Sequence, residues 1–449
     1  MKEEHRGHFG SKIGIILAAA GSAVGLGNIW RFPTEVGNNG GAAFILVYLA
    51  FVFLLAMPVM VCEFVVGRNT QMNTVDAFRR LAPKRPWYLV GLMGVLAGIL
   101  ILSFYCVVAG WTLFYGVDAL IGKLPTENLE DYNASFVTDP WRPLVYVVLF
   151  LLFTHFIVSR GIDRGIERFS KLMMPLLFLI IIVLVGYSVS MPGAEKGLTF
   201  LLKPDFSKVT SKVVFSAMGQ AFFSLSVGIG CLLTYASYYK KDVNLVRSAA
   251  SVCMLDTMVA VLAGFIIFPA VFSVGMNPGA GPALVFVTLP QVFNSAFQGM
   301  PVLGYAFSLL FYLLLLLAAL SSSISMHEIA TAFIRERFNM RRRNAAIFVT
   351  CICVLLGTAC SLSFGPWSGV TVGGMTIFGL FDFLTAKFMM PLGGIVMCLF
   401  VGWVMNRQTL RDELTNHGSL VVRIYGVLIF LIRYVAPLGV SIVFVNELL

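Results

Sequence analysis

The sequence predicts an all-α integral membrane protein with eleven transmembrane helices, and three observations support this prediction. Of the 449 residues, 58% are hydrophobic and only 12% are charged, whereas an ordinary soluble domain is about 45–50% apolar and about 25% charged. The apolar residues form long stretches, and basic residues gather in alternate connecting segments. A soluble fold could not bury this much apolar surface, which argues against a cytosolic enzyme, a nucleic-acid-binding protein and a disordered scaffold.

Eleven stretches are long enough to cross a bilayer. A spanning helix needs about 20 mainly apolar residues, because about 30 Å of hydrocarbon is crossed at 1.5 Å per residue. The predicted spans cover residues 13–36, 41–67, 88–121, 143–159, 172–191, 213–239, 243–273, 301–334, 345–363, 374–405 and 422–446. Segment 276–298 contains Pro278, Gly279, Gly281 and Pro282 and is too interrupted to span. We expect it to form an ordered outside loop with a short helix.

The basic residues predict the orientation of these spans. The N-terminus and alternate connecting segments carry 23 Lys and Arg residues, and the opposite segments carry 6. Cytoplasmic segments of membrane proteins are enriched in Lys and Arg. We therefore expect a cytoplasmic N-terminus and, after eleven crossings, a C-terminus on the outer side.

A few charged residues remain inside the predicted spans, and each costs about 2.5–3.5 kcal/mol near a helix centre unless it has a partner or a polar cavity. Asp256 lies near the middle of its span, where a buried carboxylate requires a cation. Glu63 is expected to cap a break in a neighbouring helix. Arg31 and Asp382 could form an ion pair, or each could reach the membrane surface. We expect a structural role for Arg433.

The cysteines and histidines give no sign of a metal site. All eight cysteines lie inside apolar stretches, without the spacing of metal ligands, and are expected to be small core residues. No two of the five histidines share a span or show ligand spacing. An intramembrane enzyme would need a nucleophile–base pair or a metal, so the sequence argues against an enzyme.

Two spans contain clusters of Gly and Ser at mid-membrane depth, within residues 20–28 and 220–230. One cluster alone could mean only close helix packing. Interrupted helices at matching positions of two halves, however, indicate the binding site of a transporter. Residues 11–191 and 211–405 would then be repeats of opposite topology, because each contains five spans, and 422–446 would be an additional helix. Irregular backbone at this depth implies a cavity.

Several motifs carry a family resemblance: AGSAVGLGNIWRFP from residue 20, NGG from 39, EFVVGR from 63, RGIDRGIERF from 160, residues 219–238 and SSS from 321. Through them the chain resembles the neurotransmitter:sodium symporter family over its whole length, in particular the eleven-span bacterial amino-acid transporters. The resemblance implies a leucine-transporter-like fold of two inverted five-helix repeats in which helices 1 and 6 are unwound. It also implies sodium-driven symport by alternating access in the bacterial inner membrane, with no organic cofactor.

The resemblance implies two sodium sites. One would use the carbonyls of Gly21, Val24 and Ala318 with the hydroxyls of Ser321 and Ser322. The other would use the Ala23 carbonyl, Asn28, Ser224, Asp256 and the carboxylate of the substrate. A shared carboxylate would make substrate and sodium bind cooperatively.

Asp256 also bears on chloride, because it occupies the place of the family's usual Asn ligand. Chloride-requiring animal relatives lack a carboxylate around this position, and chloride-independent bacterial members supply one. The resemblance therefore implies transport without chloride.

The resemblance also suggests the substrate. Amine-selective relatives carry Asp at the position of Gly25, so the substrate here should bring its own carboxylate and be an amino acid. Tyr105 and the amides of Leu26 and Gly27 would bind that carboxylate.

The substrate's ammonium group would meet the carbonyls of Ala23, Phe223 and Ser224, and Ser226. The side-chain pocket would be lined by Ile101, Phe223, Ile229 and Met326, with Ser322 at its edge. No charged residue is among them, which favours an apolar or aromatic amino acid; Leu, Met, Tyr and Trp all remain open.

The gates follow from the same resemblance. Phe223 and Tyr105 would form a thin lid, with Arg31 and Asp382 paired outside it. On the cytoplasmic side, Arg6 would pair with Glu336, braced by Tyr238. Lys387 departs from the family, where this stretch is uncharged, and could reach Asp382 or extend outward.

Two alternatives to a transporter are a channel and a substrate sensor. A channel would need a continuous polar pore, whereas the polar residues here cluster at one depth. A substrate sensor with the same fold that does not transport stays open as the alternative function.

Overall fold

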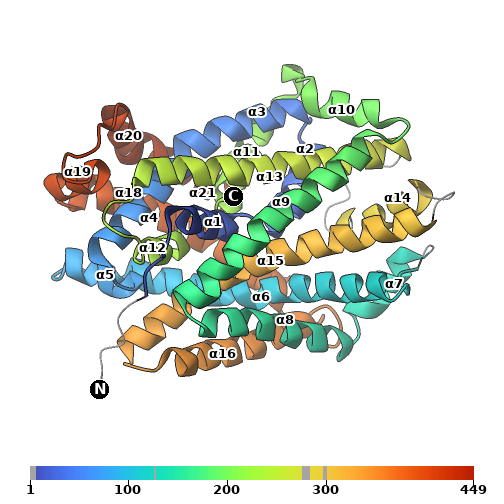
Figure 1. The fold of residues 1–449 in the computed structure, drawn as a ribbon, viewed down its shortest axis with the longest axis horizontal. Helices are drawn as coiled ribbons and strands as arrows, with labels where there is room; N and C mark the ends of the chain where they lie inside the picture. The colour runs from blue at the N-terminus through green and yellow to red at the C-terminus, as the bar shows by residue number, and fades with distance from the viewer. Residues whose placement is uncertain (1–6, 126–127, 276–283, 297–300, 449) are drawn as a thin grey trace.

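The computed structural model describes residues 7–125, 128–275, 284–296 and 301–448 and is almost entirely helical (Figure 1). The first half forms α1 (Lys12–Ala23), η1 (Gly27–Arg31), α2 (Phe32–Asn38), α3 (Ala42–Phe51), η2 (Val52–Ala56), α4 (Met57–Thr70), α5 (Thr74–Leu81), α6 (Tyr88–Leu120), α7 (Leu129–Val137), α8 (Arg142–Ser159), η3 (Ile162–Glu167), α9 (Arg168–Val189) and α10 (Ala194–Leu202).

The second half forms η4 (Phe206–Lys208), α11 (Ser211–Ser224), α12 (Cys231–Ala236), α13 (Leu245–Ser273), η5 (Leu284–Thr288), α14 (Leu289–Ala296), α15 (Pro301–Arg337), α16 (Arg342–Leu362), α17 (Ile377–Asp382), η6 (Phe383–Met389), α18 (Met390–Leu399), η7 (Phe400–Val404), α19 (Arg407–Thr415), α20 (Tyr425–Phe430), η8 (Leu431–Val435) and α21 (Ala436–Leu448). The η segments are π-helical turns, except the 3₁₀ turn η4. A two-stranded antiparallel hairpin joins β1 (Thr371–Val372) to β2 (Met375–Thr376).

Within the described residues, nine helical segments are long and apolar enough to cross a membrane, and ten are if the bent pair Lys12–Ala23 and Gly27–Asn38 counts as one span. These segments overlap ten of the eleven predicted spans, so the all-helical membrane class is confirmed. The remaining predicted span, 213–239, is divided between α11 and α12, of 14 and 6 residues. The count of eleven stays a prediction.

The helical segment over the predicted span 172–191 begins earlier, at Ile162, because a helix can continue past the apolar stretch through residues that carry charge, and this agrees with the span. One sequence prediction needs correction. Cys351 on α16 is exposed, whereas the other seven cysteines are buried. An apolar stretch of a membrane protein does not need to be covered by protein, because lipid tails can cover it.

The interrupted loop and Arg433 agree with the sequence where the structure describes them. The four Pro and Gly residues of segment 276–298 lie outside the described residues, and the remainder forms η5 and α14. Arg433 donates from Nε to the Gly402 carbonyl (2.8 Å) and lies over the Trp403 ring, which is the structural role we expected.

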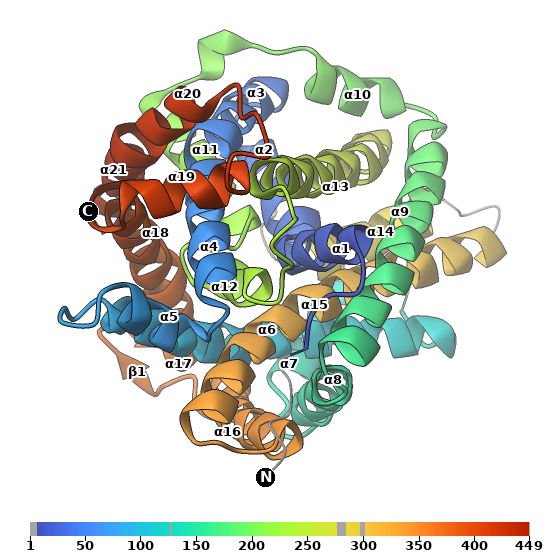
Figure 2. The same cartoon turned by 60° about the vertical axis from the view of Figure 1, so that its left-hand side comes forward.

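The interrupted segments lie inside the bundle. The long helices α6, α8 and α15 pack against one another, and α9 runs obliquely across in front, between α13 and α15 (Figure 1). Seen after the 60° turn, α1 and α12 lie toward the centre, enclosed by α8, α9, α16, α18 and α21 (Figure 2). The short broken helices therefore lie inside a ring of other helices.

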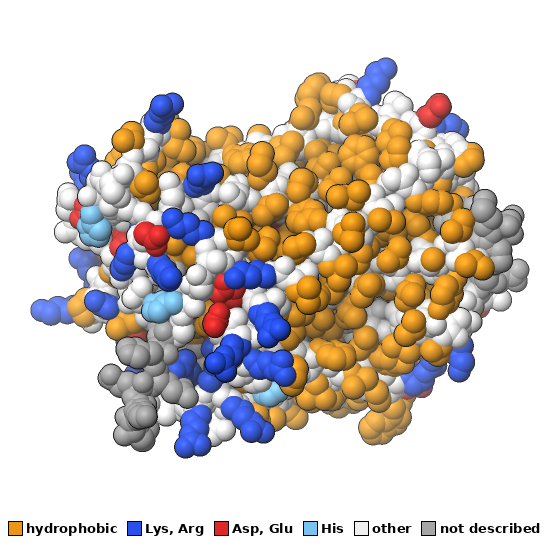
Figure 3. Space-filling view, viewed as in Figure 1, with side chains coloured by type: hydrophobic (Ala, Val, Ile, Leu, Met, Phe, Trp, Pro, Cys, Tyr) orange, Lys and Arg blue, Asp and Glu red, His pale blue; other side chains and the backbone are white. Residues whose placement is uncertain are grey.

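The surface separates apolar and charged side chains. Figure 3 shows hydrophobic side chains over most of this face and most of its Lys and Arg side chains toward the left, the end where α5 and α19 lie in Figure 1. A membrane protein with basic cytoplasmic segments has this distribution. A lipid bilayer is therefore the expected surrounding of the apolar face.

Candidate functional site

The first break lies between α1 and η1. Helix α1 ends at Ala23, and Val24 has an extended conformation (φ −65°, ψ 112°). The chain then turns by 55° between the two helical pieces. The Val24 carbonyl accepts hydrogen bonds from the hydroxyls of Ser321 and Ser322 on α15, both at 3.0 Å. The break thus directs a backbone oxygen toward another helix.

The second break lies between α11 and α12. Ser226, Gly228 and Gly230 all have positive φ, of 51°, 90° and 85°. A Cβ at Gly228 would lie 2.3 Å from the Met390 carbonyl oxygen. Glycine is therefore required there both for its backbone conformation and for its close approach to α18.

Glu63 caps this second break. The side chain is fully buried on α4, and its carboxylate accepts from the backbone amides of Gly228 (2.7 Å), Gly230 (3.4 Å) and Leu233 (3.1 Å). Unpaired amides at a helix N-terminus are well suited to bind a carboxylate. The role expected of Glu63 from the sequence is confirmed.

A cavity of about 40 Å³ lies between the two breaks. Its lining brings together all twelve predicted substrate-site residues: Ala23, Gly25, Leu26, Gly27, Ile101, Tyr105, Phe223, Ser224, Ser226, Ile229, Ser322 and Met326. It also includes Phe104, Thr385 and Met390, which the sequence did not indicate. Phe104 could have been predicted as a pocket residue because it directly precedes Tyr105. No local sequence pattern indicates Thr385 or Met390 as pocket residues.

Gly25 lies where the cavity leaves no room for a side chain. A Cβ at this position would lie 2.4 Å from Ser322 Oγ and 3.1 Å from Tyr105 Oη. The Leu26 amide donates to Tyr105 Oη at 3.2 Å, so the hydroxyl proton of Tyr105 can be donated to another acceptor. The chain therefore has no acidic side chain at position 25, and the space around Gly25 would not accommodate one.

One group of oxygen atoms surrounds Asp256, which is fully buried on α13. Its carboxylate accepts from Asn28 Nδ2 (2.7 Å) and from Ser224 Oγ (2.8 Å). Tyr48 of α3, which the sequence did not indicate, lies beside the same carboxylate. No ion pair is formed by Asp256 among the described residues, so its carboxylate is available to a small cation.

A second group of oxygen atoms lies where α1 meets α15. Ser321 Oγ lies 3.0 Å from the Val24 carbonyl oxygen and 2.9 Å from that of Ala318. Gly21 packs against Ser321, since a Cβ at Gly21 would lie 3.3 Å from Ser321 Cβ. All five residues predicted for this cation site therefore meet at one place, and they offer neutral oxygens only.

In the parts of the chain that the structure describes, no group of three or more His, Cys, Asp or Glu could hold a metal ion. A transition-metal centre would need such ligands. Oxygen ligands such as those of the two groups suit a hard cation.

The predicted outer gate is only partly assembled. The Arg31 guanidinium lies over the Phe223 ring, with its carbon 4.1 Å from the ring centroid. Arg31 acts electrostatically on Asp382, but no ion pair within 4 Å joins these two described side chains. Lys387 pairs with Glu447 at 3.0 Å, a partner that we did not expect.

The predicted inner gate is seen from one side only, because Arg6 lies outside the described residues. Glu336 accepts from the backbone and side-chain nitrogens of Asn73, both at 2.9 Å. The Tyr238 hydroxyl donates to Glu328 (2.7 Å), which also pairs with Arg342.

The fold and the site together define a class of protein. Two helices interrupted inside an apolar bundle, with a pocket between them and groups of oxygen atoms beside it, form the arrangement of secondary transporters.

The comparisons with known proteins agree. The model of the Sodium:neurotransmitter symporter family matches residues 6–141 and 137–449, and the chain belongs to this family. It is 40% identical to the sodium-dependent transporter YhdH of Bacillus subtilis, covering 99% of this chain and 98% of that protein. It is 27% identical to the human sodium- and chloride-dependent GABA transporter 2, covering 92% of this chain and 75% of that protein.

Among solved structures, the chain resembles that of MhsT in complex with L-phenylalanine. The TM-score is 0.89 and the identity 44%, over 98% of this chain and 100% of that one. The resemblance stated from the motifs is therefore confirmed, and the relatives are sodium-dependent transporters.

Proposed function

We propose that this protein is a sodium-coupled symporter that imports a hydrophobic or aromatic L-amino acid by alternating access, without a requirement for chloride. The observation that carries the proposal is the position of Asp256. Its buried carboxylate bonds to Ser224, and Ser224 also lines the cavity. A cation at Asp256 and a ligand in the cavity would therefore be neighbours.

The cavity supports an amino acid as the substrate. Gly25 leaves no acidic group to balance a bare amine, so the ligand needs a carboxylate of its own. The hydroxyl proton of Tyr105 and the amide of Gly27 would bind that carboxylate. The other lining side chains are apolar or neutral, and an ionised side chain would lose its hydration there without compensation. MhsT was solved in complex with L-phenylalanine, which is a ligand of this kind.

Two sodium ions would bind at the two oxygen groups. The first would be bound by Ala23, Asn28, Ser224, Asp256 and the substrate's carboxylate. The second would be bound by Gly21, Val24, Ala318, Ser321 and Ser322. Because the substrate is a ligand of the first ion, each would strengthen the binding of the other.

Asp256 would make chloride unnecessary. Two cations and a zwitterion add positive charge to a buried site, which needs at least one anion. Asp256 would supply that charge from the protein itself, whereas a relative such as GABA transporter 2 is described as chloride-dependent.

Alternating access would use the two interrupted helices as moving parts. We propose eleven spans, in which 11–191 and 211–405 are inverted repeats and 422–446 is an additional helix. The N-terminus would lie in the cytoplasm, with Arg6, Glu336 and Tyr238 at the inner gate. Arg31 and Asp382 would close the outer path above Phe223 and Tyr105.

Uptake into proteoliposomes tests the proposal. A panel of labelled L-amino acids is compared under an inward sodium gradient and an equal potassium gradient, with chloride or gluconate as the anion. We expect sodium-driven accumulation of apolar or aromatic amino acids with either anion. Uptake of glutamate or lysine alone would contradict the assigned pocket, and loss of uptake in gluconate would contradict chloride independence. Sodium-dependent binding without accumulation would identify the substrate sensor instead.

A further inference from the structure

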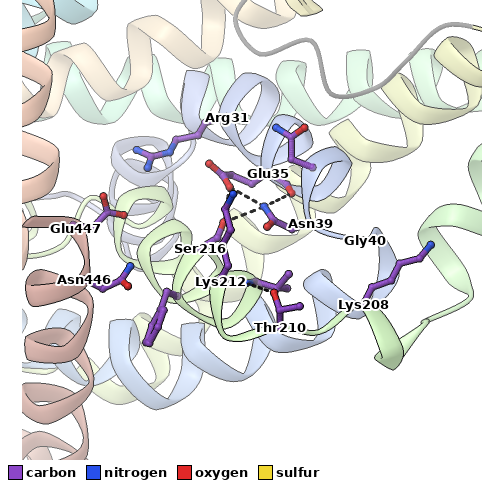
Figure 4. A pocket seen from close by; sticks show the side chains of 13 residues that line it. Arg31, Glu35, Asn39, Gly40, Lys208, Thr210, Lys212, Ser216, Asn446 and Glu447 are labelled. Atoms are coloured by element: carbon purple, nitrogen blue, oxygen red, sulfur yellow. Dashed lines mark hydrogen bonds between the residues drawn. The ribbon is translucent and has the colours of Figure 1, made fainter. Parts of the chain in front are cut away.

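Three cavities follow one another from the surface to the substrate pocket. The outermost, of about 790 Å³, is lined by residues of α2, α11 and α21 (Figure 4). A small crevice shares Arg31 and Glu447 with this outer cavity. The crevice also shares Phe223 and Met390 with the substrate pocket. These shared residues make the crevice the connection between the surface and the pocket.

The closing of this connection involves Arg31. Its guanidinium covers the Phe223 ring, which separates the crevice from the pocket. In Figure 4, Arg31 extends toward the side of the outer cavity where Glu447 projects from α21. The position of Arg31 therefore determines whether the crevice reaches the pocket.

Asp382 is the carboxylate that can hold Arg31 in place, but a second cation competes for it. The positive charges of Arg31 and Lys387 both act favourably on the Asp382 carboxylate. Lys387 follows Asp382 by five residues, and the intervening η6 is π-helical, so the two lie about one turn apart. A lysine on its flexible four-carbon stem can reach a carboxylate at this spacing.

Glu447 forms an ion pair with Lys387, the competing cation. Lys387 Nζ lies 3.0 Å from Glu447 Oε2, and the side chains are 44% and 25% exposed. The pair joins η6 to α21, the last helix of the chain. As long as it is formed, the Lys387 ammonium is paired with Glu447 and not with Asp382.

We propose that Glu447 is a positioning residue of the outer gate, which keeps Lys387 away from Asp382 so that Asp382 remains available to Arg31. The inference rests on the proposed function, because it assumes that the crevice is the path by which substrate enters. Removing the charge of Glu447 would release Lys387 toward Asp382. Arg31 would then be held less firmly over Phe223, and the path would open.

Cysteine accessibility measures this opening. Ala386 lines the crevice, and Ala386→Cys can be labelled from outside with a membrane-impermeant methanethiosulfonate reagent. Cys351→Ala removes the exposed native cysteine and gives the parent protein. We expect Glu447→Gln to raise the labelling rate about two- to fivefold, the range for a partly exposed ion pair. Asn446→Ala is the matched control, since this neighbour lines the outer cavity without a charge.

A second variant separates this role from simple attachment of the last helix. Lys387→Met combined with Glu447→Gln removes the competing cation together with its partner, and the labelling rate should return to that of the parent. Equal rates in the parent and Glu447→Gln, or a double variant that labels as fast as Glu447→Gln, would overturn the proposal. Failure of the proposed function is distinct, because the parent would then label at the same rate with and without sodium.

Discussion

Replacing Gly25 by Ala would put a methyl group where the substrate pocket meets the second oxygen group. The added Cβ would lie 2.4 Å from Ser322 Oγ. Ser322 cannot turn away without losing its 3.0 Å hydrogen bond to the Val24 carbonyl. Both the Ser322 hydroxyl and the Val24 carbonyl are proposed sodium ligands. Gly25→Ala should therefore weaken the binding of substrate and of sodium together.

The magnitude follows from the severity of the contact. Forcing an additional methyl group into a packed site costs about 1–3 kcal/mol. Since each 1.4 kcal/mol changes a dissociation constant about tenfold, the Kd for L-phenylalanine should rise about five- to 150-fold. The sodium concentration that gives half-maximal binding should rise as well.

Scintillation-proximity binding of labelled L-phenylalanine over a range of sodium concentrations measures both quantities. Gly186→Ala is a matched control, because a Cβ at this helical glycine meets nothing within 4 Å, and its binding should equal that of the unmodified protein. In a Ser322→Ala background the closest remaining contacts of the added Cβ are 3.1 Å and 3.3 Å, so Gly25→Ala should have a much smaller effect there. An equal effect in both backgrounds, or an unchanged Kd, would refute the reasoning.

Three buried carboxylates give the remaining predictions. Asp256→Asn should lower the apparent sodium affinity about tenfold or more, the loss of one charged hydrogen-bonded group. Chloride should partly restore the sodium affinity of this variant by supplying the missing negative charge. Uptake by the variant that is the same with and without chloride would contradict the proposed role of Asp256. Glu63→Gln should reduce the free energy of unfolding by about 1.5–3 kcal/mol, because the amides of Gly228 and its neighbours lose a charged acceptor; an unchanged thermal midpoint in detergent would argue against this cap. Glu413→Gln should cost about 3–5 kcal/mol, because it leaves buried Arg68 without its carboxylate. Burial alone would raise the pKa of Glu413, but Arg68 lowers it below its ordinary value. The stabilisation is therefore complete above the unfolded carboxyl's pKa of about 4.3 and is lost as the pH falls through the folded pKa; thermal midpoints measured between pH 3 and 7 should decline with acid in the unmodified protein and less in the variant.

The composition and the apolar length of its segments were sufficient for the class of the protein, whereas the pocket residues were assigned through the resemblance to the symporter family. Helices must satisfy their own backbone in lipid, so apolar length alone predicts where they occur. Gly and Ser clusters around Gly25 and Gly228 mark the breaks, because a backbone without Cβ is needed there. Ser224 and Tyr105 were assigned to the pocket through the family motifs and not from local pattern, and the structure places both in its lining.

Contacts between segments that are distant in the chain could not be predicted from the sequence. Lys387 was left between two alternatives, and only the packing of α21 against the preceding span provides Glu447. Arg68 meets Glu413 across 345 residues of chain. His155 and His327, on different helices, lie 2.9 Å from the same Thr350 hydroxyl, although no spacing in the sequence relates them.

The sequence by itself determined that this chain resides in a membrane and where Gly and Ser clusters interrupt two helices, because these follow from local hydrophobicity and backbone freedom. The residues assigned around the interruptions came from the family motifs. Only the tertiary structure decided which charged side chains neutralise one another. In a low-dielectric interior the nearest opposite charge determines the partner, and that distance depends on how whole helices pack.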